Sequence, residues 1–286
     1  MSIIQLIIFA LIQGITEWLP VSSSGHNLLA AKLFEWNTRD ELMINAMAHV
    51  GTLFAVLLYF WRDVARAVTG GFELIGAAAT RKPLTGNARL ALLILASMPI
   101  TFGVILVYEA LMTDAAETAL RSVWTVAAST VVFGILLWWA DVRGKTDRST
   151  GDMSITEALI IGASQAIAAI IPGTSRSGIT MTAARWFGFE RTEAARFAML
   201  IGAPILAAVG AYAVLELLSA EGEAGQATLT DGVIVAVLSF LSGWLSIAVL
   251  MELLKRMSFL PFVLYRIALA IVLVLASPLA LNWIQA

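Results

Sequence analysis

Cysteine is absent from the 286-residue chain, and charged residues are scarce. Without cysteine, disulfide bonds and thiol chemistry are excluded. Only 13% of the residues are charged and 59% are hydrophobic, whereas soluble domains usually have about 25% charged residues. The net charge of −2 says little by itself, and we expect no nucleic-acid partner. The mean hydropathy of +0.87 is typical of an integral membrane protein.

Long charge-free runs support this interpretation. Six windows contain no Asp, Glu, Lys or Arg: residues 42–61, 90–108, 122–140, 197–215, 232–251 and 267–286. Each is close to the ~20 residues that a helix needs to cross the hydrocarbon core. Alternating barrel strands of ~10 residues are missing from the pattern, so a helical bundle remains as the way to span a bilayer. The sequence therefore predicts an all-α polytopic protein in contact with membrane lipids.

Two stretches of the sequence resemble each other, "QGITEWLPVSSSG" and "QAIAAIIPGTSRSG". In each, a Gln lies seven residues before a Pro, and a Ser-rich stretch ending in Gly follows. The segment "DVRGKTDRSTGD" between them is polar and rich in turn-forming residues. These features predict two related halves, 1–140 and 154–286, within a single membrane domain.

Basic residues gather where the chain is expected to face the cytoplasm. Most Lys and Arg residues lie between residues 61 and 90, at the junction of the halves, just before residue 197, and from 255 to 266. With these segments inside, each Pro-interrupted stretch begins and ends on one face. We predict inverted-topology repeats, each a re-entrant helix hairpin plus three transmembrane helices. The hairpins cover 1–34 and 154–188, and the spans cover 42–61, 90–108, 122–140, 192–215, 232–254 and 262–284. A ten-crossing topology predicts the same inside and outside loops.

The tips of the predicted hairpins carry polar residues that are costly in lipid. Irregular backbone at membrane depth is tolerated only where protein or a watery cavity satisfies it. Two helix N-termini that face each other form an anion site, and the guanidinium of Arg176 can bind phosphate oxygens bidentately. The candidate phosphate-binding residues are Ser22, Ser24, Gly173, Thr174, Ser175, Ser177 and Thr180.

Three residues near the first tip suggest chemistry. Gln13 and Glu17 are four residues apart and share a helix face. Together they are a modest ligand set for Mg²⁺ or Ca²⁺, with phosphate oxygens and water completing the shell. His26 can transfer a proton near neutral pH.

Three other polar residues are interpreted as structural. His49 lies within a predicted span and is interpreted as a structural partner. Gln165 mirrors Gln13 and is expected to satisfy the backbone of the broken helix. Arg266 lies near the end of a span and is interpreted as interfacial.

The chain resembles a known family at these positions, the undecaprenyl-diphosphate phosphatases of bacteria, also called the bacitracin-resistance phosphatases. The stretches "QGITEWLPVSSSGH" and "PGTSRSGIT" are similar to two motifs of that family. "GTLFAVLLYFWRD" and "PFVLYRI" also look like family segments, so the resemblance covers nearly the whole chain. Gln13 stands where many members have Glu, which leaves one carboxylate instead of two.

The resemblance implies hydrolysis of a polyprenyl diphosphate lipid to the monophosphate and inorganic phosphate. It also implies a metal-dependent site that opens to the extracytoplasmic side of the bacterial plasma (inner) membrane, and a role in recycling the lipid carrier of peptidoglycan synthesis. Glu17, Ser23, His26 and Arg176 are then the catalytic candidates. Ser23 matches a family position assigned as nucleophile or phosphate ligand, and a metal-activated water is the competing nucleophile.

A transporter or flippase of the isoprenyl phosphate lipid is the alternative function. Inverted repeats with broken helices are a transporter architecture. A carrier does not require an acid, a hydroxyl and a histidine at one tip, so this clustering favours the enzyme. The sequence leaves open the lipid chain length, the preferred metal and the formation of a homodimer.

Overall fold

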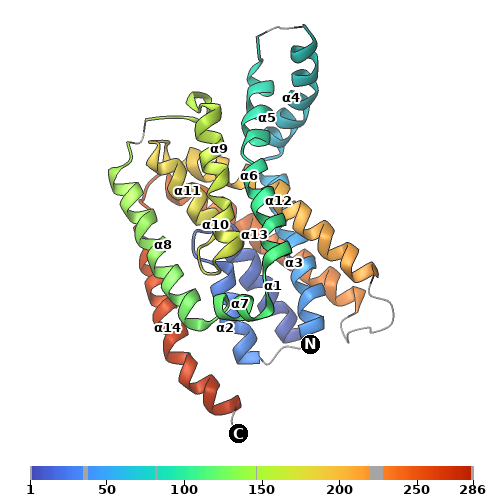
Figure 1. Ribbon diagram of the computed structural model, residues 1–286, viewed down its shortest axis with the longest axis vertical. Helices are drawn as coiled ribbons and strands as arrows, with labels where there is room; N and C mark the ends of the chain where they lie inside the picture. Colours follow the sequence, from blue (N-terminus) through green and yellow to red (C-terminus); the bar gives the residue numbers. More distant parts are fainter. Residues whose placement is uncertain (1, 35–37, 81–82, 146, 220–227, 285–286) are drawn as a thin grey trace.

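The computed structural model describes residues 2–34, 38–80, 83–145, 147–219 and 228–284 (Figure 1). Across these ranges the regular structure is entirely helical and contains no strand. An isolated bridge pairs Arg148 with Phe189. Residues 81 and 82, part of the predicted basic loop, lie outside the described residues. The prediction of an all-α protein is confirmed.

Several helices are long and apolar enough to cross a membrane. Within the described ranges there are five, or six if one bent pair counts as a single span. The five cover Gly86–Tyr108, Val123–Arg143, Arg191–Tyr212, Leu229–Leu254 and Leu260–Ser277. Ile3–Trp18 and Ile155–Ile170 are shorter apolar segments, below the ~20 residues of a full crossing. The chain is therefore a multi-pass membrane protein, whereas the inverted topology of its halves stays a prediction.

The first hairpin consists of α1 (Ile3–Trp18) and α2 (Ser23–Phe34). α1 ends before Leu19, which is extended because the proline that follows disfavours a helical conformation. Ser22 then adopts a φ of +73°, which is uncommon outside glycine. The Ser22 Oγ accepts a hydrogen bond from the Gly25 N–H at 3.2 Å, and so it caps the first turn of α2.

The second hairpin has the same local geometry at its tip. Its elements are η1 (Thr150–Asp152), α9 (Ile155–Ala163), α10 (Gln165–Ile170) and α11 (Arg176–Trp186). Ser175 has a φ of +68°, and its Oγ accepts a hydrogen bond from the Gly178 N–H at 3.2 Å. The residue after Ser175 is Arg176, and the residue after Ser22 is Ser23. The side chains of Ser23 and Arg176 therefore occupy equivalent positions, directly after the residue with positive φ in each tip.

The segment between residues 61 and 90 is mostly helical, although the sequence predicted a loop. α3 (Thr38–Tyr59) meets α4 (Trp61–Thr80) at a bend of 86°. α4 lies beside α5 (Gly86–Ala96), and the two project from one end of the molecule (Figure 1). A Cβ at Gly70 would collide with the backbone of Asn87. This close backbone contact lets a charged segment form a helix, because one face of the helix is packed.

The remaining helices complete the membrane domain. They are α6 (Pro99–Leu111), α7 (Asp114–Leu120), α8 (Val123–Arg143), α12 (Arg191–Ser219), α13 (Leu229–Leu254) and α14 (Leu260–Ile284). α13 packs closely against both α1 and α3: a Cβ at Gly14 would collide with the Ser239 carbonyl, and one at Gly51 with the Ala236 carbonyl. Small residues permit such approach between membrane helices. α13 therefore fixes α1 and α3 relative to each other.

Candidate functional site

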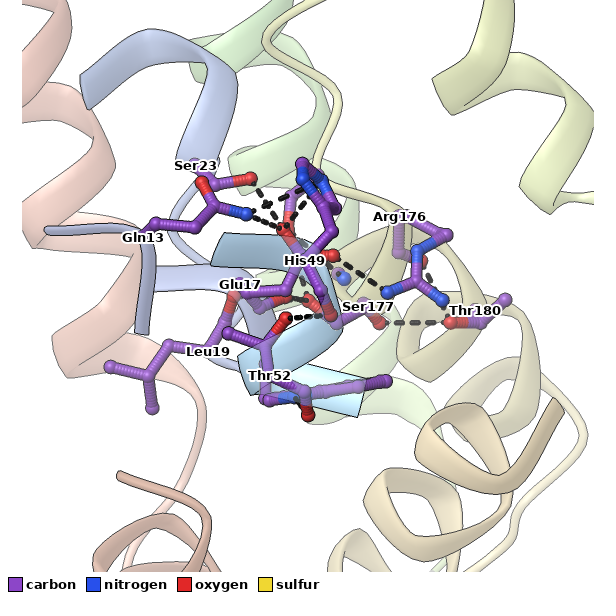
Figure 2. Close-up of polar contacts among 12 residues, drawn as sticks. Gln13, Glu17, Leu19, Ser23, His49, Thr52, Arg176, Ser177 and Thr180 are labelled. Carbon is purple, nitrogen blue, oxygen red and sulfur yellow. Dashed lines mark hydrogen bonds and ion pairs between the residues drawn. The ribbon is translucent and has the colours of Figure 1, made fainter. Parts of the chain in front are cut away.

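The carboxylate of Glu17 lies at the centre of a hydrogen-bonded cluster (Figure 2). Its Oε2 accepts hydrogen bonds from Gln13 Nε2 at 2.9 Å and Ser23 Oγ at 3.0 Å. Its Oε1 accepts a hydrogen bond from Arg176 Nη2 at 2.8 Å, within an ion pair. Glu17 is only 8% exposed, so protein donors take the place of water around its charge. The cluster joins α1, α2 and α11, which are the helices of the two tips.

The guanidinium of Arg176 is held between an aromatic ring and a glycine. Its Cζ lies 4.9 Å from the centre of the Trp18 ring, in a cation–π contact. On α12, a Cβ at Gly202 would collide with Arg176 Nη1. The missing side chain at Gly202 therefore gives the guanidinium its place beside Glu17.

Further hydrogen bonds connect the tips directly. The Gly173 N–H donates to Ser24 Oγ at 3.0 Å, and Ser177 Oγ donates to the Leu19 carbonyl at 3.0 Å. Gly173 has a φ of +90°, a conformation that suits glycine because it lacks a Cβ. These contacts place the second tip against both the end of α1 and the start of α2.

Arg266 of α14 is fully buried and bonds to the backbone of both tips. Its Nε donates to the Thr130 carbonyl at 2.8 Å, and its Nη2 donates to the carbonyls of Gly173 and Thr174, both at 3.0 Å. Its Nη1 lies 3.4 Å from the Pro20 carbonyl. Its interpretation as interfacial was wrong, because broken helices leave buried carbonyls that need donors and a guanidinium offers five.

His49 belongs to this cluster, although the sequence suggested only a structural role. Its Nδ1 lies 2.7 Å from the Asn45 carbonyl, which can only accept, so Nδ1 carries the hydrogen. Its Nε2 lies 3.3 Å from Gln13 Nε2 and 3.9 Å from Glu17 Oε2. The amide of Gln13 thus donates to Glu17 and His49, while its Oε1 accepts from Asn27 Nδ2 at 2.9 Å.

His26 points to a different neighbour. Its Nδ1 lies 2.8 Å from the Ser22 carbonyl, and its Nε2 lies 2.6 Å from the Tyr265 hydroxyl. The His26 and Tyr265 rings are stacked, with centroids 5.5 Å apart. The hydrogen bonds of His26 therefore connect it to the first tip and α14, and none joins it to Glu17 or Ser23 among the described residues.

A cavity of about 230 Å³ lies in front of the Glu17 cluster. Its polar lining includes Glu17, Ser23, Ser24, His49, Thr101, Gln165, Gly173, Ser175 and Arg176. The other candidate phosphate ligands, Ser22, Thr174, Ser177 and Thr180, are not part of this lining, and each bonds through its hydroxyl to backbone atoms of the tips. The apolar lining includes Ile105 of α6 and Ile205, Leu206 and Val209 of α12. The cavity thus has a polar wall for a charged group and an apolar wall.

A second cavity of about 350 Å³ adjoins the first, since Ser24, Ala168 and Ala169 line both. Asn27, Asn45 and Arg121 also line this second cavity. The polar surface therefore continues beyond the Glu17 cluster, past the start of α2.

Comparison with known proteins identifies the family. A family model described as "Bacitracin resistance protein BacA" matches residues 6–272. The chain belongs to this family. An "Undecaprenyl-diphosphatase" of Hyphomonas neptunium is 60% identical over 279 residues, which is 98% of each chain. Proteins of the same name from Maricaulis maris and Jannaschia sp. are 45% and 43% identical, and they match 96% and 97% of this chain over 98% and 99% of their own.

The cluster of this BacA family member fits a divalent cation in one arrangement of its amides. No group of three or more His, Cys, Asp or Glu within the described part of the chain could hold a metal, and in this cluster Glu17 is the carboxylate available to a cation. Gln13 turns its NH₂ group toward Glu17. Turning the amides of Gln13 and Asn27 together keeps their mutual bond and brings Gln13 Oε1 beside Glu17, because amide O and N are interchangeable in shape. This arrangement gives up the hydrogen bonds that Gln13 Nε2 donates to Glu17 and His49, and a cation would have to replace them. Phosphate oxygens and water would complete the shell of Mg²⁺ or Ca²⁺.

Gln165 differs from its sequence-based interpretation. Its side chain was expected to satisfy the backbone of the broken helix. Neither Nε2 nor Oε1 has a hydrogen-bond partner within the described ranges, so that expectation was wrong. Gln165 and Gln13 each lie seven residues before a proline, and this shared spacing was the feature of the sequence that singled out Gln165.

Proposed function

We propose that this chain hydrolyses undecaprenyl diphosphate to undecaprenyl phosphate and inorganic phosphate. In this role it recycles the lipid carrier of peptidoglycan synthesis and confers resistance to bacitracin. The observation that carries the proposal is the buried Glu17 carboxylate, which accepts hydrogen bonds from Arg176 and Ser23 at one cavity. The names of the relatives support the same activity, and none of the three reported above indicates a transporter.

The two walls of the cavity match the two parts of this substrate. The guanidinium of Arg176 and the N-terminal turns of α2 and α11 bind the diphosphate. The isoprenyl chain passes from the cavity to the surrounding lipid along Leu206 and Val209, which line the cavity. Val209 is 47% exposed, so this side of the cavity is in reach of the lipid. The lipid can then react without leaving the membrane.

In this proposal Ser23 acts as the nucleophile. Its Oγ–H donates to Glu17 at 3.0 Å, so Glu17 can accept the proton as the oxygen attacks the terminal phosphorus. The bond from that phosphorus to the bridging oxygen breaks, and undecaprenyl phosphate leaves with the bridging oxygen. Water then hydrolyses the phosphoserine, which releases inorganic phosphate and restores the hydroxyl. Direct attack by water is the competing route.

A cation held by Glu17 and Gln13 would supply positive charge that neutralises the transferred phosphoryl group. Arg176 performs a related task with its own charge, since it can bind phosphate oxygens from its place against Trp18. Proton transfer by His26 stays a prediction, and it requires the bond to Tyr265 to open.

The site opens, in this proposal, to the extracytoplasmic side of the plasma membrane. The basic residues between 61 and 90 and at 255 and 256 support it, because they favour the cytoplasmic side. The second cavity, whose lining includes Asn27, Asn45 and Arg121, offers the inorganic phosphate a polar exit. A homodimer stays a prediction.

Phosphate release by the purified protein in detergent tests the proposal. Undecaprenyl diphosphate is supplied with Mg²⁺, with Ca²⁺ or with a chelator, and Glu17→Ala and Arg176→Ala are measured beside the wild type. Glu252→Ala and Arg256→Ala are matched controls, because they break an exposed ion pair of 3.0 Å at the end of α13. We expect metal-dependent release that is lost in the first two variants and retained in the controls. Folded wild-type protein that releases no phosphate with either metal would refute the function.

A further inference from the structure

Gln165, the first residue of α10, has a buried side-chain amide that the protein leaves unpaired. The residue is 1% exposed, and it lines the same cavity as Glu17, Ser23 and Arg176. Neither its Nε2 nor its Oε1 has a hydrogen-bond partner within the described ranges. Buried polar groups in native proteins are nearly always hydrogen-bonded to protein or to ordered water, so the amide is available to a group that enters the cavity.

The equivalent residue in the other hairpin shows the contrast. Gln13 also lies seven residues before its proline, and it is fully buried. Its Nε2 contacts Glu17 and His49, and its Oε1 accepts from Asn27. Broken-helix architecture therefore does not by itself leave such an amide without partners.

The chemistry of the cavity indicates what the partner is. A carboxamide presents two N–H donors and a carbonyl acceptor. Phosphoryl oxygens accept from the donors, and water on the phosphate donates to the carbonyl. Unlike a lysine, a neutral amide does not compete with Arg176 for the Glu17 carboxylate. We propose that Gln165 binds the diphosphate of the substrate directly, through Nε2, in the cavity that it lines together with Arg176; this role rests on the proposed phosphatase function.

A substitution by methionine separates this role from a structural one. Gln165→Met keeps the length of the side chain and removes both polar ends. An unpaired amide contributes nothing favourable to the folded state, so its removal leaves the thermal midpoint unchanged or higher. Gln13→Met is the comparison variant, since it breaks three contacts within the protein and should lower the midpoint.

The catalytic effect follows from the loss of a hydrogen bond to a charged phosphate. Such bonds correspond to roughly tenfold to hundredfold in kcat/KM. We expect Gln165→Met to lose this factor while the protein remains folded. Gln165→Glu should lose more, because its charge would repel the phosphate.

The test uses full-length protein in detergent and measures three quantities: kcat/KM with undecaprenyl diphosphate, the thermal midpoint, and the rise in that midpoint on adding inorganic diphosphate. Ligand that binds only the folded state raises the midpoint. We expect Gln165→Met to lower kcat/KM and to reduce the rise caused by diphosphate, with the midpoint of the free protein retained.

Two results would overturn the inference. Unchanged kcat/KM together with an unchanged diphosphate shift would show that Gln165 does not touch the ligand. A fall of the midpoint equal to that of Gln13→Met would show a structural role. If the wild type releases no phosphate, the phosphatase proposal fails on its own, and the diphosphate shift still decides whether Gln165 binds the anion.

Discussion

Replacing Gly202 by alanine is expected to disable the site while leaving the fold intact. A Cβ at this position lies 3.0 Å from Arg176 Cζ and 3.2 Å from the Trp18 ring, and it collides with Arg176 Nη1. Comfortable contact needs about 3.5–4.0 Å, so the guanidinium must move by roughly 1 Å. A misplacement of about 1 Å can reduce catalysis ~10²-fold, which corresponds to about 2.7 kcal/mol in the activation barrier. The fold should persist with a modest loss of stability, because the helix propensity gained with alanine, up to ~1 kcal/mol, offsets part of an overpacking cost of about 1–3 kcal/mol.

The assay compares Gly202→Ala with Gly210→Ala on the same helix. A Cβ at Gly210 has Val50 as its nearest neighbour, at an ordinary 3.7 Å. Both variants should remain folded in detergent, with at most a small fall of the thermal midpoint for Gly202→Ala, and only Gly202→Ala should lose phosphate release. Full activity in Gly202→Ala would refute the idea that the position of Arg176 limits the reaction. Equal losses in both variants would point to helix flexibility instead of the site.

Further predictions concern the residues that hold or attack the phosphate. Arg176→Lys should lower kcat/KM by about 10–100-fold, because an ammonium lacks the planar fork; near wild-type turnover would exclude bidentate binding. Ser23→Ala should reduce phosphate release by ~10³-fold or more if Ser23 is the nucleophile, whereas a loss of about tenfold would favour attack by water. Arg266→Met should lower the free energy of unfolding by ~3 kcal/mol or more, because buried carbonyls lose their donors. An unchanged thermal midpoint would show that the hydrogen bonds from Arg266 to the two tips do not stabilise the fold.

The helical membrane fold was predictable from composition and charge-free runs. Without the alternation of barrel strands, these runs leave helices as the way to span the bilayer, because a helix satisfies every backbone group within its own segment. The helix α4 was missed because its sequence is charged. Its packing depends on a close approach between Gly70 and Asn87, a contact that periodicity within one segment does not reveal.

The polar tips were also predictable, because Pro20, Ser23 and Arg176 are unusual in apolar surroundings. What the sequence did not reveal is which side chains face one another. His49 contacts Gln13 from another helix. Gly202 leaves room for the guanidinium of Arg176 because it has no Cβ. Such relations arise from tertiary packing, and local spacing carries no information about them.

The hydrogen bonds from the buried Arg266 to both tips have a consequence for the synthesis of the protein. The ribosome produces both tips before it reaches α14, so Pro20 and Gly173 enter the membrane while their eventual donor is not yet synthesised. A nascent chain that ends before residue 266 contains both motifs in full, yet the carbonyls at its broken helices lack the guanidinium that joins them. The two tips therefore receive their full set of side-chain donors only when the last helix is inserted.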